Sequence, residues 1–223
     1  MDNLTLIIPA KNEAESLPIV LSELKKYNYK TDIVLHATDI DTIQAIKKYE
    51  INIVYQENFG YGDALIHGIK QCKTKYFCIF NADGSFNPAE INKMHEALQA
   101  KKLDFIFASR YQANSGSDDD TIITLVGNYI FTYIGKIFFR LNISDILYTF
   151  IIGKTESANI LDLKQKDFSF CVELPIKAKR IKMELGCIES YERKRIAGKK
   201  KVNAFKDGFL ILKYMIKLFF MKS

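Results

Sequence analysis

The first half of the chain alternates short apolar runs with segments of helical periodicity, and this pattern limits the possible folds more than any other feature of the sequence. The apolar runs have the length of strands, and the intervening segments repeat apolar residues every three or four positions. Such alternation is typical of parallel sheets joined by right-handed helical crossovers. We therefore expect a Rossmann-like, mostly parallel α/β sheet, doubly wound and flanked by helices, with strands at Leu4–Pro9, Asp32–His36, Ile51–Tyr55, Tyr76–Phe80 and Leu103–Ala108.

The remaining elements follow from the same periodicity. Pro88 suits the first turn of a helix, where a missing N–H leaves no partner unsatisfied. The second half of the chain is less regular, but two further strands are expected at Asp145–Lys154 and Cys187–Tyr191. The predicted helices are Glu13–Tyr27, Asp41–Tyr49, Tyr61–Cys72, Pro88–Ala100, Thr121–Phe139, Phe168–Lys182 and Asp207–Met221.

The size and charge of the chain limit its domains and partners. With 223 residues, 48% of them hydrophobic, it can bury the core of one α/β domain, expected over residues 1–205. The net charge of +6 is concentrated from Arg193 onward, and residues 206–223 are expected to form a basic amphipathic helix. A basic tail can attract nucleic acid, anionic lipid or a phosphorylated ligand. No nucleic-acid-binding motif accompanies it, so nucleic acid is not expected.

Three features indicate a cytoplasmic protein. Met1 leads directly into a strand, without the pattern of a signal peptide. Two long apolar stretches, Ile122–Phe139 and Phe209–Met221, are interrupted by polar residues, and by the ~20-residue criterion neither is expected to cross a membrane. The cysteines lack zinc-type spacing and are expected to be reduced core residues; they are Cys72, Cys78, Cys171 and Cys187.

Polar residues follow each predicted strand. Doubly wound sheets bind ligands beyond the carboxyl ends of their strands, so these residues should meet at one edge. The clusters are Ala10–Glu13, Thr38–Asp39, Gln56–Asn58, Asn81–Asp83 and Ser109–Arg110.

Asn81 and Asp83 follow the most apolar strand. In extended backbone, side chains two positions apart face the same way, so both can point at one ligand. Their oxygens suit a hard cation that leaves positions for diphosphate oxygens. The alternative is a polar turn, since Asp-Gly is a common turn pair.

Two glycines lie in the segment Asn58–Ala64, before a predicted helix. They permit close approach of an anionic ligand to backbone N–H groups. Their position and spacing do not fit the dinucleotide fingerprint G-x-G-x-x-G. A loop that needs positive φ is the alternative.

In their order and spacing, these segments resemble the motifs of family 2 glycosyltransferases, and of its dolichol-phosphate-mannose-synthase-like branch in particular. The resemblance covers almost the whole chain. The matching segments are Pro9–Glu13 for P-A-x-N-E, Asn58–Ala64 for N-x-G-x-G-x-A, Asn81–Ser85 for D-A-D, Ser109–Tyr111 for G-S-R, and Glu189–Gly198, continued by Asn203–Gly208, for E-V-P-x-x-x-x-x-R-x-x-G.

The resemblance implies an inverting enzyme of GT-A fold that uses a UDP- or GDP-sugar with Mg²⁺ or Mn²⁺. Asp83 would hold the metal with Asn81 and Ser85, and Asp83 and Arg195 would act in catalysis. Arg110 would face the acceptor phosphate or the donor diphosphate, because guanidinium groups bind phosphate through forked hydrogen bonds; a solvated surface charge is the alternative. The implied donor-binding residues are Pro9, Ala10, Asn12, Glu13, Asp39, Gly60, Ala82, Arg110 and Lys201.

Three departures from the family pattern bear on the site. The D-D-G-S-x-D motif is replaced by His36–Asp41, where Asp39 or Asp41 can substitute. Asn81 stands in place of the first aspartate of D-A-D, which should weaken metal binding. Lys199–Lys201 replace the usual S-K or S-N, and their charge could compensate at the diphosphate.

A hydroxyl acceptor needs a general base, whereas a lipid phosphate is already an anion and needs none. The two candidates are Asp145 and Glu173. The alternative for Glu173 is a helix-face carboxylate paired with a lysine. The lack of an obvious base favours a phosphate acceptor.

The C-terminal helix, which is rich in lysine and aromatic residues, can lie in a lipid headgroup region, and Thr121–Phe139 can do the same. Packing on the sheet, or in a homodimer interface, is the alternative.

We therefore expect hexose transfer from a UDP- or GDP-sugar to polyprenyl phosphate or another membrane-held glycan precursor, at the inner face of the cell membrane. Two alternatives remain. One is transfer to a sugar hydroxyl in surface polysaccharide assembly, and the other is a non-catalytic assembly partner that binds nucleotide-sugar or lipid.

Overall fold

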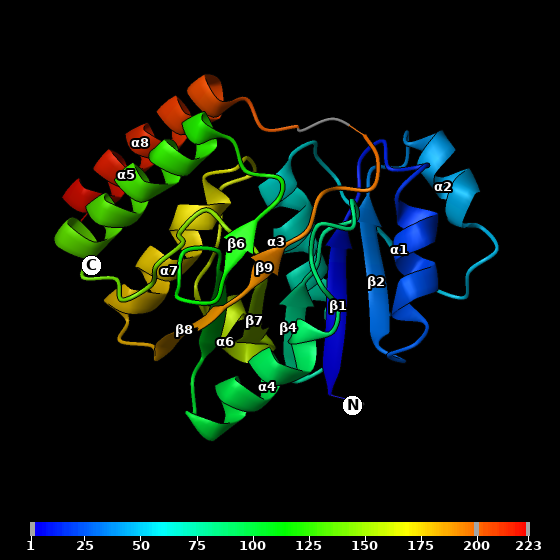
Figure 1. Cartoon of the computed structure of the whole chain (residues 1–223), viewed down its shortest axis with the longest axis horizontal. Coiled ribbons are helices and arrows are strands. Elements are labelled where there is room, and N and C mark those ends of the chain that lie inside the picture. Colours follow the sequence, from blue (N-terminus) through cyan, green and yellow to red (C-terminus); the bar gives the residue numbers. More distant parts are fainter. Residues whose placement is uncertain (1–2, 199–200, 222–223) are drawn as a thin grey trace.

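A mixed sheet of seven strands forms the centre of the protein, in the order β3-β2-β1-β4-β7-β5-β8 (Figure 1). The computed structural model describes residues 3–198 and 201–221. All neighbouring strands are parallel except that β7 runs antiparallel to both β4 and β5. The strands are β1 (Leu4–Pro9), β2 (Lys30–Leu35), β3 (Asn52–Tyr55), β4 (Tyr76–Ile79), β5 (Phe105–Ser109), β7 (Ile151–Lys154) and β8 (Leu185–Glu189), and a separate pair joins β6 (Gly116–Ser117) to β9 (Tyr191–Glu192).

Helices cover both faces of this sheet, as a doubly wound fold requires. One apolar core lies under α3, α6 and α7, and the other lies under α1 and α4. Every residue of the central strand β4 is buried, which accounts for its apolar sequence. The helices are α1 (Leu17–Leu24), α2 (Ile40–Ile46), α3 (Tyr61–Gln71), α4 (Glu90–Ala100), α5 (Ile122–Phe139), α6 (Thr155–Ile160), α7 (Phe170–Arg180) and α8 (Ala204–Phe220).

The expected mostly parallel α/β fold is confirmed, with local corrections. Helix α1 begins at Leu17 instead of Glu13, because the intervening residues form a turn and Pro18 lies in the first turn of the helix. Only the last four residues of the predicted strand Asp145–Lys154 pair in the sheet. Helix α6 and the short pair β6–β9 were not predicted from the sequence.

Helices α5 and α8 form an outer layer that packs on α7 (Figure 1). They lie side by side, and near their C-terminal ends the Phe219 ring contacts the rings of Phe138 and Phe139. Each has a side-chain cap, from Thr121 for α5 and from Asn203 for α8. Contrary to the sequence expectation, the 18-residue α5 is long and apolar enough to cross a membrane by length and composition, and only 22% of it is buried.

The cysteines fit the expected core role. Cys72, Cys78 and Cys171 are buried, Cys187 is partly buried, and all four are free thiols.

Candidate active site

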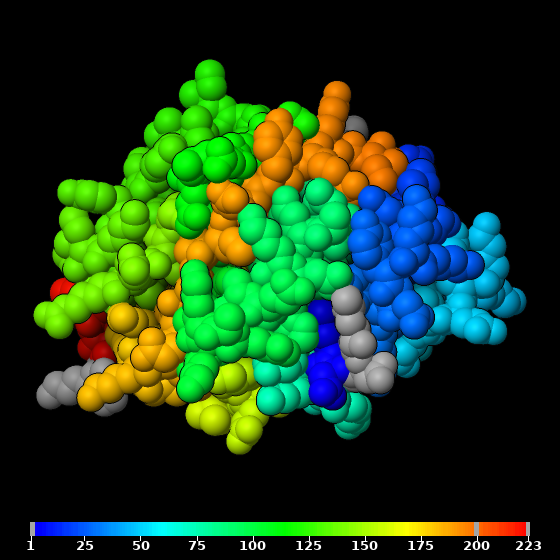
Figure 2. Space-filling model, turned by 60° about the horizontal axis from the view of Figure 1, so that its bottom comes forward, coloured from blue at the N-terminus to red at the C-terminus, as the bar shows by residue number. Residues whose placement is uncertain are grey.

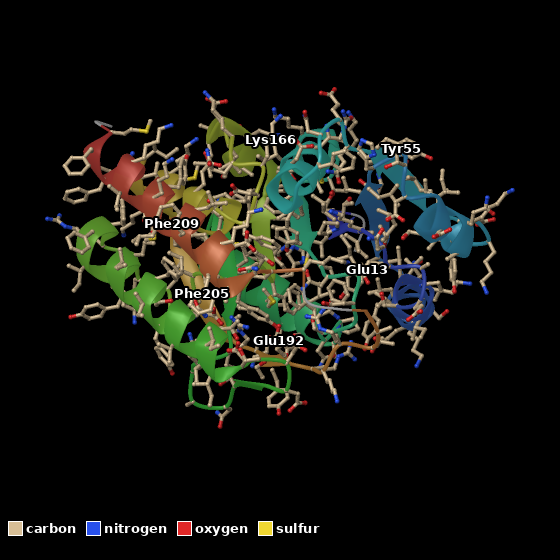
Figure 3. All side chains as sticks on the ribbon, turned by 90° about the horizontal axis from the view of Figure 1, so that it is seen from above. Glu13, Tyr55, Lys166, Glu192, Phe205 and Phe209 are labelled. Atoms are coloured by element: carbon tan, nitrogen blue, oxygen red, sulfur yellow. The ribbon has the colours of Figure 1, made fainter. Side chains whose placement is uncertain are left out.

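The polar clusters meet at the carboxyl edge of the sheet, as the fold predicts. Because β1 to β5 all point the same way, their following residues lie on one edge, and Figure 3 looks down on it. The backbone N–H of Asn12 donates to Asp39 Oδ2 at 2.7 Å, which supports its φ of +52°. The other carboxylate oxygen of Asp39 caps α2 by accepting the Thr42 N–H. These contacts join the ends of β1 and β2.

Glu13 lies on this edge with its side chain nearly buried (Figure 3). Its carboxylate accepts a hydrogen bond from the Ser16 hydroxyl and pairs with the ammonium of Lys201. The neighbouring Ala10 is buried and donates its N–H to Val34 O at 2.9 Å, and Pro9 closes β1. The start of the chain is thus tied to the basic segment near its end.

The turn after β4 presents Asp83. Ser85 donates to Asp83 Oδ1 from its backbone N–H at 3.0 Å and from its hydroxyl at 2.7 Å. Asn81 Nδ2 lies 3.4 Å from the Ser85 hydroxyl, and Asn81 Oδ1 lies 3.5 Å from the Tyr61 hydroxyl. Ala82, which lies between Asn81 and Asp83 in the sequence, is buried. The sequence-predicted metal residues Asn81, Asp83 and Ser85 are therefore one hydrogen-bonded cluster.

Residues 193–198, called here the basic strap, lie along the Asp83 turn. The N–H of Arg193 donates to Ser85 O, and the N–H of Ile196 donates to Asp83 O, both at 2.8 Å. Gly84 has a φ of +80°, and a Cβ added there would lie 2.4 Å from Ile196 Cδ1. Glycine is thus needed here for its backbone conformation, and it leaves room for the Ile196 side chain. In Figure 2 the orange strap crosses the surface from the green part of the chain towards the blue N-terminal region.

The strap brings Arg195 to the cluster. Arg195 Nη1 lies 3.5 Å from Asp83 Oδ2, while Nε and Nη2 donate to the two oxygens of Asp119 at 3.2 and 2.8 Å. The hydrogen bond to Asp119 is the largest cause that raises the pKa of Arg195, and the charge of Asp83 adds to it. Arg195 therefore remains cationic between two carboxylates.

Arg110 lies in a buried carboxylate network, and this differs from the expectation that it faces a phosphate. Its Nε and Nη2 donate to Asp145 at 2.8 and 3.1 Å, and its Nη1 donates to Glu192 at 3.0 Å. The guanidinium also lies 4.5 Å from the Tyr148 ring centroid. Burial alone would lower the pKa of Arg110, but the charge and hydrogen bonds of Asp145 outweigh it and raise the pKa. With only 10% of its side chain exposed, Arg110 supports the site from beneath.

The pKa of Glu192, a nearly buried carboxyl of this network, is raised. Burial raises its pKa above the ordinary value of 4.5, although Arg110 and the Ser117 hydroxyl work in the opposite direction. Figure 3 places Glu192 on the same edge as Glu13. Its role was missed from the sequence, because only the fold brings it to Arg110.

The glycines of Asn58–Ala64 accommodate protein backbone, and the donor contact expected of Gly60 stays a prediction. A Cβ on Gly60, whose φ is +137°, would lie 2.1 Å from Lys166 O. A Cβ on Gly62 would lie 2.1 Å from Gln165 O. The alternative of a loop that needs positive φ is therefore the one that fits.

Glu173, the expected general base, is fully buried away from this cluster. Its carboxylate accepts the backbone N–H groups of Lys164 and Gln165 at 2.9 and 2.8 Å and the Tyr214 hydroxyl at 2.8 Å. It also pairs with Lys177, four residues later, at 2.8 Å. These are the contacts of a structural carboxylate that joins α7, α8 and the loop before α7. The structure therefore fits the alternative for Glu173, a helix-face carboxylate paired with a lysine. It does not fit a partly buried general base.

Asp145, the other candidate general base, is also bound to protein partners. It is fully buried, and besides Arg110 it accepts from the Asn128 side-chain amide of α5. Both candidate bases are thus committed to protein partners.

The cluster fits a divalent cation only weakly by its own donors. Asp83 supplies one carboxylate, whose Oδ1 is already used by Ser85, and Arg195 lies beside Oδ2. In the described residues no group of three or more His, Cys, Asp or Glu side chains could hold a metal ion. Donor phosphates would have to supply most of the ligands, which is common for Mg²⁺.

Two ion pairs of the site were not predicted from the sequence. Asp119 belongs to an acidic run visible in the sequence, but its pairing with Arg195 depends on the path of the strap. Of the three late lysines, Lys201 pairs with Glu13, whereas Lys199 and Lys200 lie outside the described residues.

Comparison with known proteins agrees with this fold. The family model for glycosyl transferase family 2 matches residues 5–160. An uncharacterized protein of Methanocaldococcus jannaschii is 29% identical over 138 residues, which cover 60% of this chain and 57% of that protein. An uncharacterized glycosyltransferase of Mycobacterium tuberculosis is 28% identical over 109 residues, 49% of each chain. The match to these curated relatives thus spans about half of their length.

A more complete match is the UDP-N-acetylglucosamine–dolichyl-phosphate N-acetylglucosaminyltransferase of Methanococcus voltae. It is 24% identical over 205 residues, covering 81% of this chain and 82% of that enzyme.

Among solved structures, glucosyl-3-phosphoglycerate synthase from Mycobacterium tuberculosis in complex with UDP has a TM-score of 0.76 at 11% identity, covering 100% of this chain and 82% of the other. The same enzyme with Mn²⁺, UDP and phosphoglyceric acid has a TM-score of 0.71 at 11% identity, with 100% and 80% covered. These similarities identify the GT-A fold. The match of the family model over most of the chain decides the family, and this protein belongs to glycosyl transferase family 2.

Proposed function

We propose that this chain transfers a hexose from a UDP- or GDP-sugar, with inversion, to polyprenyl phosphate or another membrane-held glycan precursor. The observation that carries the proposal is the basic strap, which brings Arg195 to Asp83 while Lys201 pairs with Glu13 on the same edge. Paired charges at the carboxyl ends of parallel strands suit a diphosphate ligand.

The donor would lie along the edge from the end of β1 to the end of β4. Pro9, Ala10, Asn12 and Glu13 would contact the nucleoside. Arg195 and Lys201 would exchange their carboxylate partners for diphosphate oxygens and stabilise the leaving group. Arg110 would act indirectly, because Asp145 and Glu192 hold it beneath the site.

A divalent cation, Mg²⁺ or Mn²⁺, would be held by Asp83 Oδ2 with help from Asn81 and Ser85, and it would supply positive charge to the departing diphosphate. Structures of the similar synthase contain Mn²⁺ with UDP, which supports this part of the proposal. We expect activity to fall in chelator and to return with Mn²⁺. Activity that is unchanged in chelator would favour the strap cations alone.

A phosphate acceptor suits this site because both candidate general bases are already bound to protein partners. Asp145 and Glu173 are fully buried and saturated by partners, whereas a lipid phosphate needs no proton removed. The relative from Methanococcus voltae is named for a dolichyl-phosphate acceptor, which supports the same choice.

The outer helices suit a membrane-held acceptor. They expose a row of apolar side chains, and Phe205 and Phe209 begin it at the site end of α8 (Figure 3). Thr124 and Asn128 tie the start of α5 to the site through Asp120 and Asp145. Exposed cations flank this face at Lys136, Arg140, Lys206, Lys213 and Lys217. This arrangement supports surface attachment at the inner face of the membrane, with the site edge towards the lipid.

The test is product formation. The protein would be incubated with UDP-glucose, UDP-N-acetylglucosamine or GDP-mannose, Mn²⁺ and vesicles containing polyprenyl phosphate, and glycosylated lipid would be measured by mass spectrometry. We expect product from one donor with the wild type and none with Asp83→Ala. Product formed only with a soluble sugar acceptor would support hydroxyl transfer. Donor binding without turnover on any acceptor would support the non-catalytic partner.

A further inference from the structure

An aromatic pair lies at the far end of the candidate donor edge and has no evident role in the core. His36 directly follows β2, and Phe59 follows β3. Their rings stack with centroids 4.1 Å apart and planes inclined by 28°. Phe59 is 64% exposed, so one large apolar ring is left in solvent at a strand end.

The pair is fixed to the nucleoside end of the edge. The Asp39 N–H donates to His36 O at 3.0 Å, which closes a turn, and Asp39 Oδ2 holds the backbone of Asn12. Within this turn the Thr38 N–H lies 3.3 Å from His36 Nδ1, and the Thr38 hydroxyl lies 2.8 Å from it. The imidazole is therefore oriented before any ligand arrives.

The spacing of the sheet agrees with the length of a nucleotide. In the order β2-β1-β4, the end of β2 lies two strand positions from the Asp83 turn. Two such spacings are about 10 Å, a span comparable with that from base to diphosphate. A diphosphate near Asp83 and Arg195 would therefore leave its base close to the His36–Phe59 pair.

We propose that His36 and Phe59 form a stacking platform for the nucleobase of the donor. This inference rests on the proposed function and gives a role to two residues that differ from, or are not fixed by, the family motifs: His36 opens the segment that replaces D-D-G-S-x-D, and Phe59 is the variable residue after Asn58. A planar base extends an existing stack of rings, and alanine replacement of a stacking partner weakens base binding by roughly fivefold or more. The platform supplies affinity for the base and not for the phosphates.

The test distinguishes binding of the nucleobase from binding of the phosphates. Binding of UDP and GDP would be measured by calorimetry in Mn²⁺, with inorganic pyrophosphate as a probe that lacks a base. His36→Ala and Phe59→Ala should each weaken the preferred nucleotide roughly fivefold or more, and pyrophosphate affinity should stay unchanged. Phe59→Leu, which keeps apolar bulk but removes the π face, should weaken the nucleotide as well. Tyr133→Ala, an equally exposed aromatic on α5, is the matched control.

Two results would overturn this inference and leave the proposed function standing. One is unchanged nucleotide affinity in both alanine variants, and the other is a parallel loss of pyrophosphate affinity. Unchanged melting temperatures would show that the variants are folded. If the folded wild type bound neither nucleotide, the proposed function would fail as well, so the two failures can be told apart.

Discussion

At the scale of single residues, the site is a set of carboxylates and cations that already neutralise one another. Asp83 receives Ser85 on one oxygen and Arg195 near the other, and Arg195 is shared with Asp119. A ligand must therefore exchange these partners, and the residues whose partners can change are the ones that should control activity.

Asp83 should be essential for turnover. Asp83→Asn keeps the shape of the turn but removes the charge that would hold a cation, so we expect kcat/KM to fall roughly 100-fold or more. Steady-state transfer assays would measure this. Asp162→Asn removes an exposed aspartate that pairs with Lys164 at the surface, and it should leave activity unchanged. Similar activity of the two variants would refute the role of Asp83.

Glu173 should matter for stability and not for chemistry. Glu173→Gln breaks a buried pair with Lys177, and we expect a loss of about 3 kcal/mol in the free energy of unfolding. Urea denaturation measures this loss, and kcat of the folded protein should stay near the wild-type value. A large fall in kcat without loss of stability would instead restore Glu173 as a general base.

At the scale of elements, close packing explains features that resemble ligand motifs. The start of α3 presses against the loop 164–167, and this loop is held in turn by Glu173. The Tyr61 ring stacks on Phe168 in the same place. The glycines are thus needed where two backbone segments meet.

Glycine substitutions test this packing. In Gly62→Ala the new methyl would overlap Gln165 O, and we expect a loss of about 3 kcal/mol in unfolding free energy. Gly127→Ala is the matched control, because its Cβ would meet nothing within 4 Å and alanine favours a helix. It should stabilise the protein by about 0.5–1 kcal/mol. Chemical denaturation of both variants would measure the difference, and equal effects would contradict the account.

The ends of β5, β7 and β8 are joined by Asp104, which gives a pH prediction. Burial acts to raise its pKa, but hydrogen bonds from Lys154, the Glu184 N–H and Ser157 outweigh it and lower the pKa below the ordinary 3.8. A lowered folded-state pKa adds stability above pH 3.8, and this stability is lost as pH falls through the folded value. Asp104→Asn should destabilise by about 1–2 kcal/mol at pH 7 and much less near pH 3. Urea titrations at both pH values check this, and an equal loss would contradict it.

At the scale of the whole molecule, the sheet and its inner helices form the donor edge, while α5 and α8 form a separate apolar face beside it (Figure 1). The two are connected at one end, because Asp120 and Asp145 of the site region bind Thr124 and Asn128 of α5. Under the proposed function, this connection would let a lipid-held acceptor reach the donor edge from the membrane surface.

This face should bind anionic vesicles. Replacing Phe205 and Phe209 together by serine removes two exposed rings, and we expect vesicle affinity to weaken about tenfold or more. Co-sedimentation with phosphatidylglycerol vesicles measures it, and high salt should weaken the wild type. Ile160→Ser on α6 is a control of similar exposure. Unchanged vesicle binding, together with loss of a concentration-dependent dimer, would instead assign the face to a homodimer.

The sequence by itself determined which segments form most strands of the sheet and which polar residues lie at its carboxyl edge. Apolar periodicity decides strands and helices locally, and parallel strands bring the residues after them to one edge, so Asn12, Glu13, Asp39 and Asp83 were found correctly at that edge. Only the tertiary structure decided which of the predicted site residues already have partners within the protein. The partners of Arg110, Glu173 and Gly60 come from segments 35 to 106 residues away or from a nearby loop whose path no local pattern encodes. Long-range packing, and not residue type, gives these residues their partners within the protein.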